Sequence, residues 1–177
     1  QNVDGDDNQA SGYNAGQSVT GNNNLASGEG AGQNVTGDSN TSIGQDAGAG
    51  MGAGSLGNTY LGWGTGQNST GSWNQASGVS AGNNVNGHYN QALGLSAGRN
   101  VTGDYNQASG AYAGQDVSGD YNQSAGAYAG NSVTGSYNQA AGVQAGQNVD
   151  GDDNQASGYN AGQNVSGSEK DATGTRA

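Results

Sequence analysis

Small apolar residues recur at fixed positions along this chain, with polar residues and glycine between them. The repeated unit reads N-Q-A-S-G-x-x-A-G-Q-N-V-T-G-D-Y and returns every 16 residues, except for one step of 18 between Asn40 and Asn58. Its valine position is interrupted only by Met51 and Ser69, and otherwise holds Val3, Val19, Val35, Val85, Val101, Val117, Val133, Val149 and Val165. A fixed short period over 177 residues predicts a stack of repeated units.

Glycine occupies three further columns, which begin at Gly5, Gly12 and Gly16. The gaps of 4, 5 and 7 residues exclude an amphipathic helix, because glycine costs about 1 kcal/mol at a helical position and recurs in every turn. Two short extended segments per unit fit instead, roughly Q-A-S-G-x and Q-N-V-T, joined by turns in which glycine and asparagine take positive φ. The chain is therefore predicted to be all-β, with each unit forming one coil of a parallel β-solenoid.

Asparagine forms one column of the unit. We expect these side chains to be structural, with their amides hydrogen-bonded from coil to coil as in cross-β stacks. The predicted ladder consists of Asn8, Asn24, Asn40, Asn58, Asn74, Asn90, Asn106, Asn122, Asn138 and Asn154.

Residues 1–177 are predicted to form a single repetitive domain of ten 16-residue coils. Residues 45–66 form an irregular coil, because they hold the two-residue insertion and several glycines outside the main columns. We interpret this coil as a bulged loop that projects from the rod, either functional or simply tolerated. Residues 168–177 look like the start of a further, variant repeat.

The composition is poor in large apolar residues and carries a net charge of -11, which is typical of disordered chains. The regular valine column favours a folded chain, since disorder needs no such period. Each coil still buries little apolar surface, so it would gain most by covering a second face with identical chains. We therefore predict an obligate homo-oligomer.

Several functions are excluded by the residues present. The chain has no cysteine and one histidine, His88, so no nucleophilic triad or metal-ligand cluster can be assembled, and no enzyme, cofactor or metal site is expected. His88 lies in a turn column otherwise filled mainly by Asp, Asn and Ser, which favours a solvated turn residue. With 3 basic residues against 14 acidic ones, a nucleic-acid partner is excluded, and no apolar run is long enough to insert in a membrane.

The acidic turns at residues 4–8 and 150–154 suggest calcium. An EF-hand loop would need glycine at Gln9 and a bidentate glutamate at Ala15, so the pattern fails.

Aromatic residues are the candidate binding residues. Tyrosine and tryptophan are favoured at binding surfaces because each offers a large rigid face and a polar tip. The alternative is that they stack on one another or pack between subunits. One column holds Trp73, Tyr89, Tyr105, Tyr121 and Tyr137, and a second holds Tyr112 and Tyr128.

The segment Gly37-Asp38-Ser39-Asn40-Thr41-Ser42-Ile43-Gly44 resembles the head repeat of YadA-like trimeric autotransporter adhesins, and the resemblance extends over the whole chain. It implies a left-handed parallel β-roll that associates as a homotrimer. The unit departs from the family in its 16 residues, where the commonest head repeat has 14, and in having Ser or Ala in most coils at the aliphatic position of Ile43.

The resemblance also implies a virulence-related adhesin head on the bacterial cell surface, anchored in the outer membrane by a region outside this chain. Such heads attach to host cells or to matrix proteins of the collagen and fibronectin class. A passive spacer that presents another binding domain stays open as the alternative. An ice-binding solenoid is disfavoured, because flat Thr-x-Thr ladders are absent.

Overall fold

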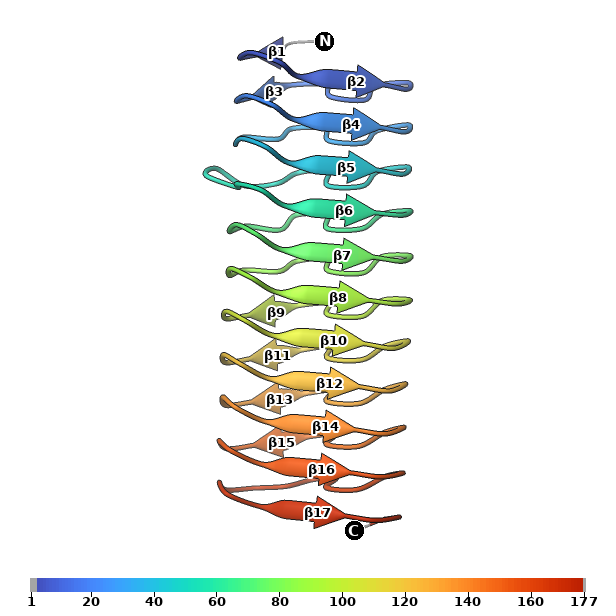
Figure 1. The fold of residues 1–177 in the computed structure, drawn as a ribbon, viewed down its shortest axis with the longest axis vertical. Helices are drawn as coiled ribbons and strands as arrows, with labels where there is room; N and C mark the ends of the chain where they lie inside the picture. Colours follow the sequence, from blue (N-terminus) through green and yellow to red (C-terminus); the bar gives the residue numbers. More distant parts are fainter. Residues whose placement is uncertain (1–2, 177) are drawn as a thin grey trace.

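The computed structural model describes residues 3–176, which form a rod of stacked coils with the two chain ends at opposite ends of the rod (Figure 1). Each coil adds one strand to a parallel sheet of 11 strands, and no helix occurs among these residues. The predicted all-β parallel β-solenoid with coils of about 16 residues is confirmed. The homotrimeric state stays a prediction.

The long sheet is built from three-residue strands that pair with their own copies in register. Gln91 lies opposite Gln107, and across the irregular coil Thr41 lies opposite Thr59. The middle residue points into the rod and its neighbours point outward. The strands are β2 (Gln9–Ser11), β4 (Leu25–Ser27), β5 (Thr41–Ile43), β6 (Thr59–Leu61), β7 (Gln75–Ser77), β8 (Gln91–Leu93), β10 (Gln107–Ser109), β12 (Gln123–Ala125), β14 (Gln139–Ala141), β16 (Gln155–Ser157) and β17 (Asp171–Thr173).

The valine segments form shorter strands on the other side of the coil. Only the V-T part of the expected Q-N-V-T segment is extended, because the residue before valine turns the chain with positive φ, as at Asn100 (56°). Isolated bridges such as Thr70 to Asn86 continue this pairing between the sheets. The strands are β1 (Val3–Asp4), β3 (Val19–Thr20), β9 (Val101–Thr102), β11 (Val117–Ser118), β13 (Val133–Thr134) and β15 (Val149–Asp150).

The core is a narrow column of alanine and valine inside the coils. Ala92, Ala97 and Val101 are buried, as are their counterparts in most other coils. The glycines of the column that begins at Gly16 keep the core narrow. A Cβ at Gly98, for example, would lie 2.8 Å from the Cβ of Ala92. The single chain therefore buries its core alanines and valines in coils of small cross-section.

The irregular coil contains only two residues outside the register. Met51 takes the place of valine and Ser55 that of a turn glycine, so residues 53–54 are the insertion. The Ser55 carbonyl still accepts the Asn40 amide at 2.9 Å, as the turn glycine does in other coils. The projecting loop between β5 and β6 in Figure 1 marks this insertion.

One coil exchanges its large and small core residues. Tyr60 replaces the inward alanine and is buried, while Ser69 replaces the valine of the same coil. A Cβ at Gly66 would meet the Tyr60 ring at 2.3 Å, so the ring lies over this glycine, and its hydroxyl end lies near Ser69. The phenol hydroxyl has no hydrogen-bond partner within the described residues, and burial raises its pKa well above the ordinary value.

Candidate binding surface

The main aromatic column lies at a tight turn just before each long-sheet strand. Trp73 and the four tyrosines all have a left-handed backbone, with φ of 62° at Trp73 and 59° at Tyr105. This conformation costs a bulky residue roughly 1–2 kcal/mol, yet the turn is held by bonds between coils, such as Tyr105 N–H to the His88 carbonyl at 2.9 Å. The scaffold therefore fixes where the aromatic side chains point.

The four tyrosines of this column form a continuous stack. Ring centroids lie 4.9 Å apart from Tyr89 to Tyr105 and from Tyr105 to Tyr121, and 5.0 Å apart from Tyr121 to Tyr137. The planes are within 7° of parallel, and the side chains remain 42–54% exposed. The face of each ring packs against the next ring, whereas the ring edges and hydroxyls are exposed to solvent. We call this stack the tyrosine ladder.

Other predicted aromatic residues lie apart from this stack. Trp73 covers the neighbouring coil, where a Cβ at Gly57 would lie 2.5 Å from the indole ring. Tyr112 and Tyr128 form a second stack, with centroids 5.0 Å apart. They follow the strands that the tyrosine ladder precedes, so the two stacks lie at opposite ends of those strands.

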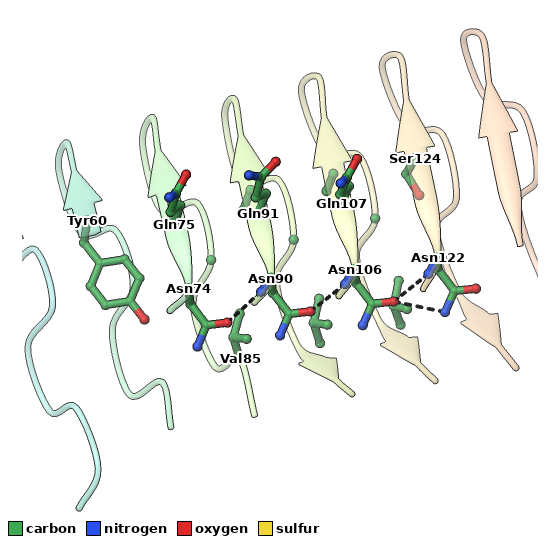
Figure 2. Close-up of a pocket in the computed structure, with 18 residues that line it drawn as sticks. Tyr60, Asn74, Gln75, Val85, Asn90, Gln91, Asn106, Gln107, Asn122 and Ser124 are labelled. Carbon is green, nitrogen blue, oxygen red and sulfur yellow. Dashed lines mark hydrogen bonds between the residues drawn. The ribbon is translucent and has the colours of Figure 1, made fainter. Parts of the chain in front are cut away.

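A row of glutamines runs beside the tyrosine ladder. Gln75, Gln91, Gln107 and Gln123 are the first, outward-facing residues of their strands, and we call them the glutamine ladder. Within residues 3–176, none of these four amides makes a side-chain hydrogen bond, whereas Gln115 in another column donates to the Ser96 carbonyl at 2.7 Å. Figure 2 shows three of them in a row on successive coils.

A groove of about 480 Å³ runs between the two ladders. It is lined by Gly57, Trp73, Tyr89, Tyr105 and Tyr121 on one side and by the glutamine ladder on the other. Sequence reasoning missed the glutamines as part of the site. Their unbroken run from Gln75 to Gln155 was the available signal, but it does not reveal that the amides are free of partners.

The groove is lined by uncharged groups and flanked by acidic ones. Asp104 and Asp120 precede groove tyrosines, and Asp104 Oδ1 accepts the His88 backbone N–H at 2.7 Å. Desolvation first, then the neighbouring phenols and these two carboxylates, raises the pKa of Tyr121 above its ordinary value. The surface therefore disfavours anionic ligands.

The asparagine ladder lies inside the rod, and Figure 2 shows Asn74, Asn90, Asn106 and Asn122 linked from coil to coil. Asn90 donates its backbone N–H to Asn74 Oδ1 at 2.9 Å and its side-chain amide to the Gly103 carbonyl at 2.9 Å. In several coils the side-chain amide also reaches the preceding Oδ1, as from Asn122 to Asn106 at 3.1 Å. The ladder joins side chain to backbone as well as amide to amide.

His88 takes part in a turn ladder of its own. Its Nδ1 accepts the backbone N–H of Ser72 at 3.0 Å, the bond that Asp38 makes with Asn22 in an earlier coil. The expected solvated turn residue is therefore also an acceptor between coils.

Other kinds of site find little support in the described residues. No group of three or more His, Cys, Asp or Glu side chains there could hold a metal ion. The interior around Asn74–Asn122 leaves a cavity of about 20 Å³, room for roughly one water. From residue 3 to residue 176, no helix has the length and apolarity to cross a membrane.

The fold and groove define a parallel β-solenoid with a polar aromatic side wall. Comparison of the chain with known protein families, curated proteins and solved structures finds no match.

Proposed function

We propose that this chain is the binding head of a YadA-like trimeric autotransporter adhesin on a bacterial surface. The observation that carries the proposal is the exposed tyrosine ladder, set on a rigid rod beside an open groove. Partners are host cell-surface or extracellular matrix molecules. A region outside this chain anchors the protein in the outer membrane.

Rigidity supports a binding role for this wall. Backbone bonds between coils hold each tyrosine in place, so little conformational freedom is lost when a ligand binds. The same contacts recur on successive coils, and three chains would triple them. Weak contacts then add through effective concentration.

Exposed aliphatic residues support the trimer. Ile43, Leu61 and Leu93 occupy the outward third position of their strands and are 40%, 40% and 47% exposed on the single chain. They share the column of the small-small-aliphatic segment that resembles adhesin heads. Covering them with a second chain would remove apolar surface from water.

The first test measures the molar mass of the purified chain by light scattering, with far-UV circular dichroism on the same sample. A mass of three chains with a β spectrum supports the head assembly. A β-rich monomer contradicts the trimer while leaving the binding role to be measured separately.

The second test measures attachment of beads coated with the chain to host cells, collagen and fibronectin. The Tyr105→Ala/Tyr121→Ala variant should lower attachment. Tyr13→Ala and Tyr159→Ala serve as matched controls, because these tyrosines are exposed outside the ladder. A folded chain that attaches to nothing would be a passive spacer.

A further inference from the structure

We propose that the groove between the tyrosine and glutamine ladders binds a linear, uncharged polysaccharide, one sugar unit to each coil. The inference rests on the proposed attachment function and names the ligand class of the same surface.

Unused hydrogen-bonding groups carry the inference. Each glutamine of the ladder offers two donors and a carbonyl acceptor, and each tyrosine offers a hydroxyl. Neither set makes a side-chain hydrogen bond within residues 3–176, and the coils of Tyr89, Tyr105 and Tyr121 each present one residue of both sets to the groove. A ligand that satisfies them must carry donors and acceptors at every step, as the hydroxyls of a sugar chain do.

The ring arrangement sets the mode of contact. Stacking at 4.9 Å leaves no room for a sugar between neighbouring rings such as Tyr89 and Tyr105. The ligand therefore meets ring edges and phenol hydroxyls along one wall and amides along the other. Each sugar unit bridges the two ladders.

The spacing of the groove disfavours peptide ligands. An extended peptide advances about 3.3 Å per residue, which does not match a 4.9 Å repeat. Strand addition needs a free sheet edge, and here the strands pair along the rod, so no edge runs beside the groove. A pyranose unit in an extended chain advances by a distance close to one coil.

Charge disfavours anionic polymers. The chain carries a net charge of -11, and Asp104 and Asp120 flank the groove. Nucleic acids and uronic or sulfated glycans would be repelled by this field. Neutral sugars are not repelled by this negative charge.

Groove length predicts a dependence on chain length. The lining runs from the coil of Gly57 to that of Gln123, which spans about 20 Å at roughly 4.8 Å per coil. Affinity should rise from a disaccharide to a pentasaccharide and then level off.

The experiment is calorimetric titration of the full chain with cello-, chito- and manno-oligosaccharides of two to six units. A hyaluronan hexasaccharide tests the effect of charge. We expect at least one neutral series to bind, with affinity rising as the groove fills, and the hyaluronan probe not to bind.

Variants locate the site. Gln91→Ala/Gln107→Ala should weaken binding about tenfold or more, as expected for a few lost hydrogen bonds. Tyr105→Phe should weaken binding several-fold while keeping the ring stack. Gln155→Ala should change nothing, since it lies in the same column beside Asp153 and outside the groove.

The outcomes separate this inference from the proposed function. Attachment to cells or matrix without oligosaccharide binding overturns the inference alone, and loss of both activities overturns both. Binding that is indifferent to the groove variants, independent of chain length or restricted to the charged probe also overturns it.

Discussion

The rings of Tyr105 and Tyr121 lie 4.9 Å apart with their planes 3° from parallel, although both residues have φ of 59°. A bulky residue rarely adopts this backbone region. The coil imposes it, and stacking offsets part of its cost. The ladder therefore combines local strain with contacts between coils.

Substitutions at Tyr105 should separate these two effects. Alanine removes both ring contacts and keeps the strained backbone, so we expect the neighbouring coils to lose about 1–3 kcal/mol. Glycine removes the same contacts and relieves the strain, so it should cost about 1 kcal/mol less. Hydrogen exchange of the backbone amides of neighbouring coils measures the difference. If glycine destabilises more than alanine, strain does not contribute.

The interior asparagines should be far less tolerant than exposed ones. Asn90→Ala leaves the Asn106 N–H and the Gly103 carbonyl without their partner, which should cost about 2–4 kcal/mol. Asn86→Ala, at an exposed and extended position, is the matched control and should cost well under 1 kcal/mol. Denaturant unfolding and hydrogen exchange give both values. Equal effects would remove the asparagine ladder as a source of stability.

Tyr60 and Ser69 should be strongly coupled. Tyr60→Ala leaves a cavity and should cost about 3–5 kcal/mol, and Ser69→Val should cost about 1–3 kcal/mol by crowding the ring. The double variant rebuilds the ordinary Ala and Val pair, so its loss should be much smaller than the sum. A double-mutant cycle in urea tests this, and additive losses would show that the two side chains do not share one space.

Alkaline pH should destabilise the folded chain. Unfolded Tyr60 ionises near the ordinary pKa of 10.0, while burial raises the pKa of the folded residue. The stabilisation is complete below pH 10 and is lost as pH rises from there toward the folded pKa, because the unfolded state releases its proton first.

Tyr60→Phe isolates this contribution. The variant should be at least as stable at neutral pH, since it removes a hydroxyl without a hydrogen-bond partner. It should also lose less stability than the parent above pH 10. Urea midpoints at pH 8 and pH 11 measure both effects, and parallel pH profiles would contradict the assignment to Tyr60.

Sequence alone predicts the solenoid because each register position recurs as a column. The step between Asn40 and Asn58 places the insertion in one coil, and the asparagine column predicts a hydrogen-bonded ladder, although not that the ladder lies inside the rod. Strand length could not be obtained in this way, since turns such as that at Asn100 shorten the segment before valine.

Sequence reasoning predicts the side wall less well. It expects glycine and asparagine at positive φ, whereas the turn before the strand also accepts Tyr105. Periodicity identifies Ser69 as an exception but not its relation to Tyr60, because a column gives no distance across the core. The glutamine ladder becomes a candidate only when its amides are found without partners.

Among the strands of residues 3–176, contacts join only neighbouring coils. The length of the rod can therefore change over evolutionary time without changing the residues on the surface of the remaining coils. Recombination between repeats could add or delete whole coils without redesigning the rest, and the identity of residues 1–17 with residues 147–163 shows how interchangeable the units are. Each coil gained or lost within the ladder would then add or remove one tyrosine, so selection could change the length of the ladder in single steps.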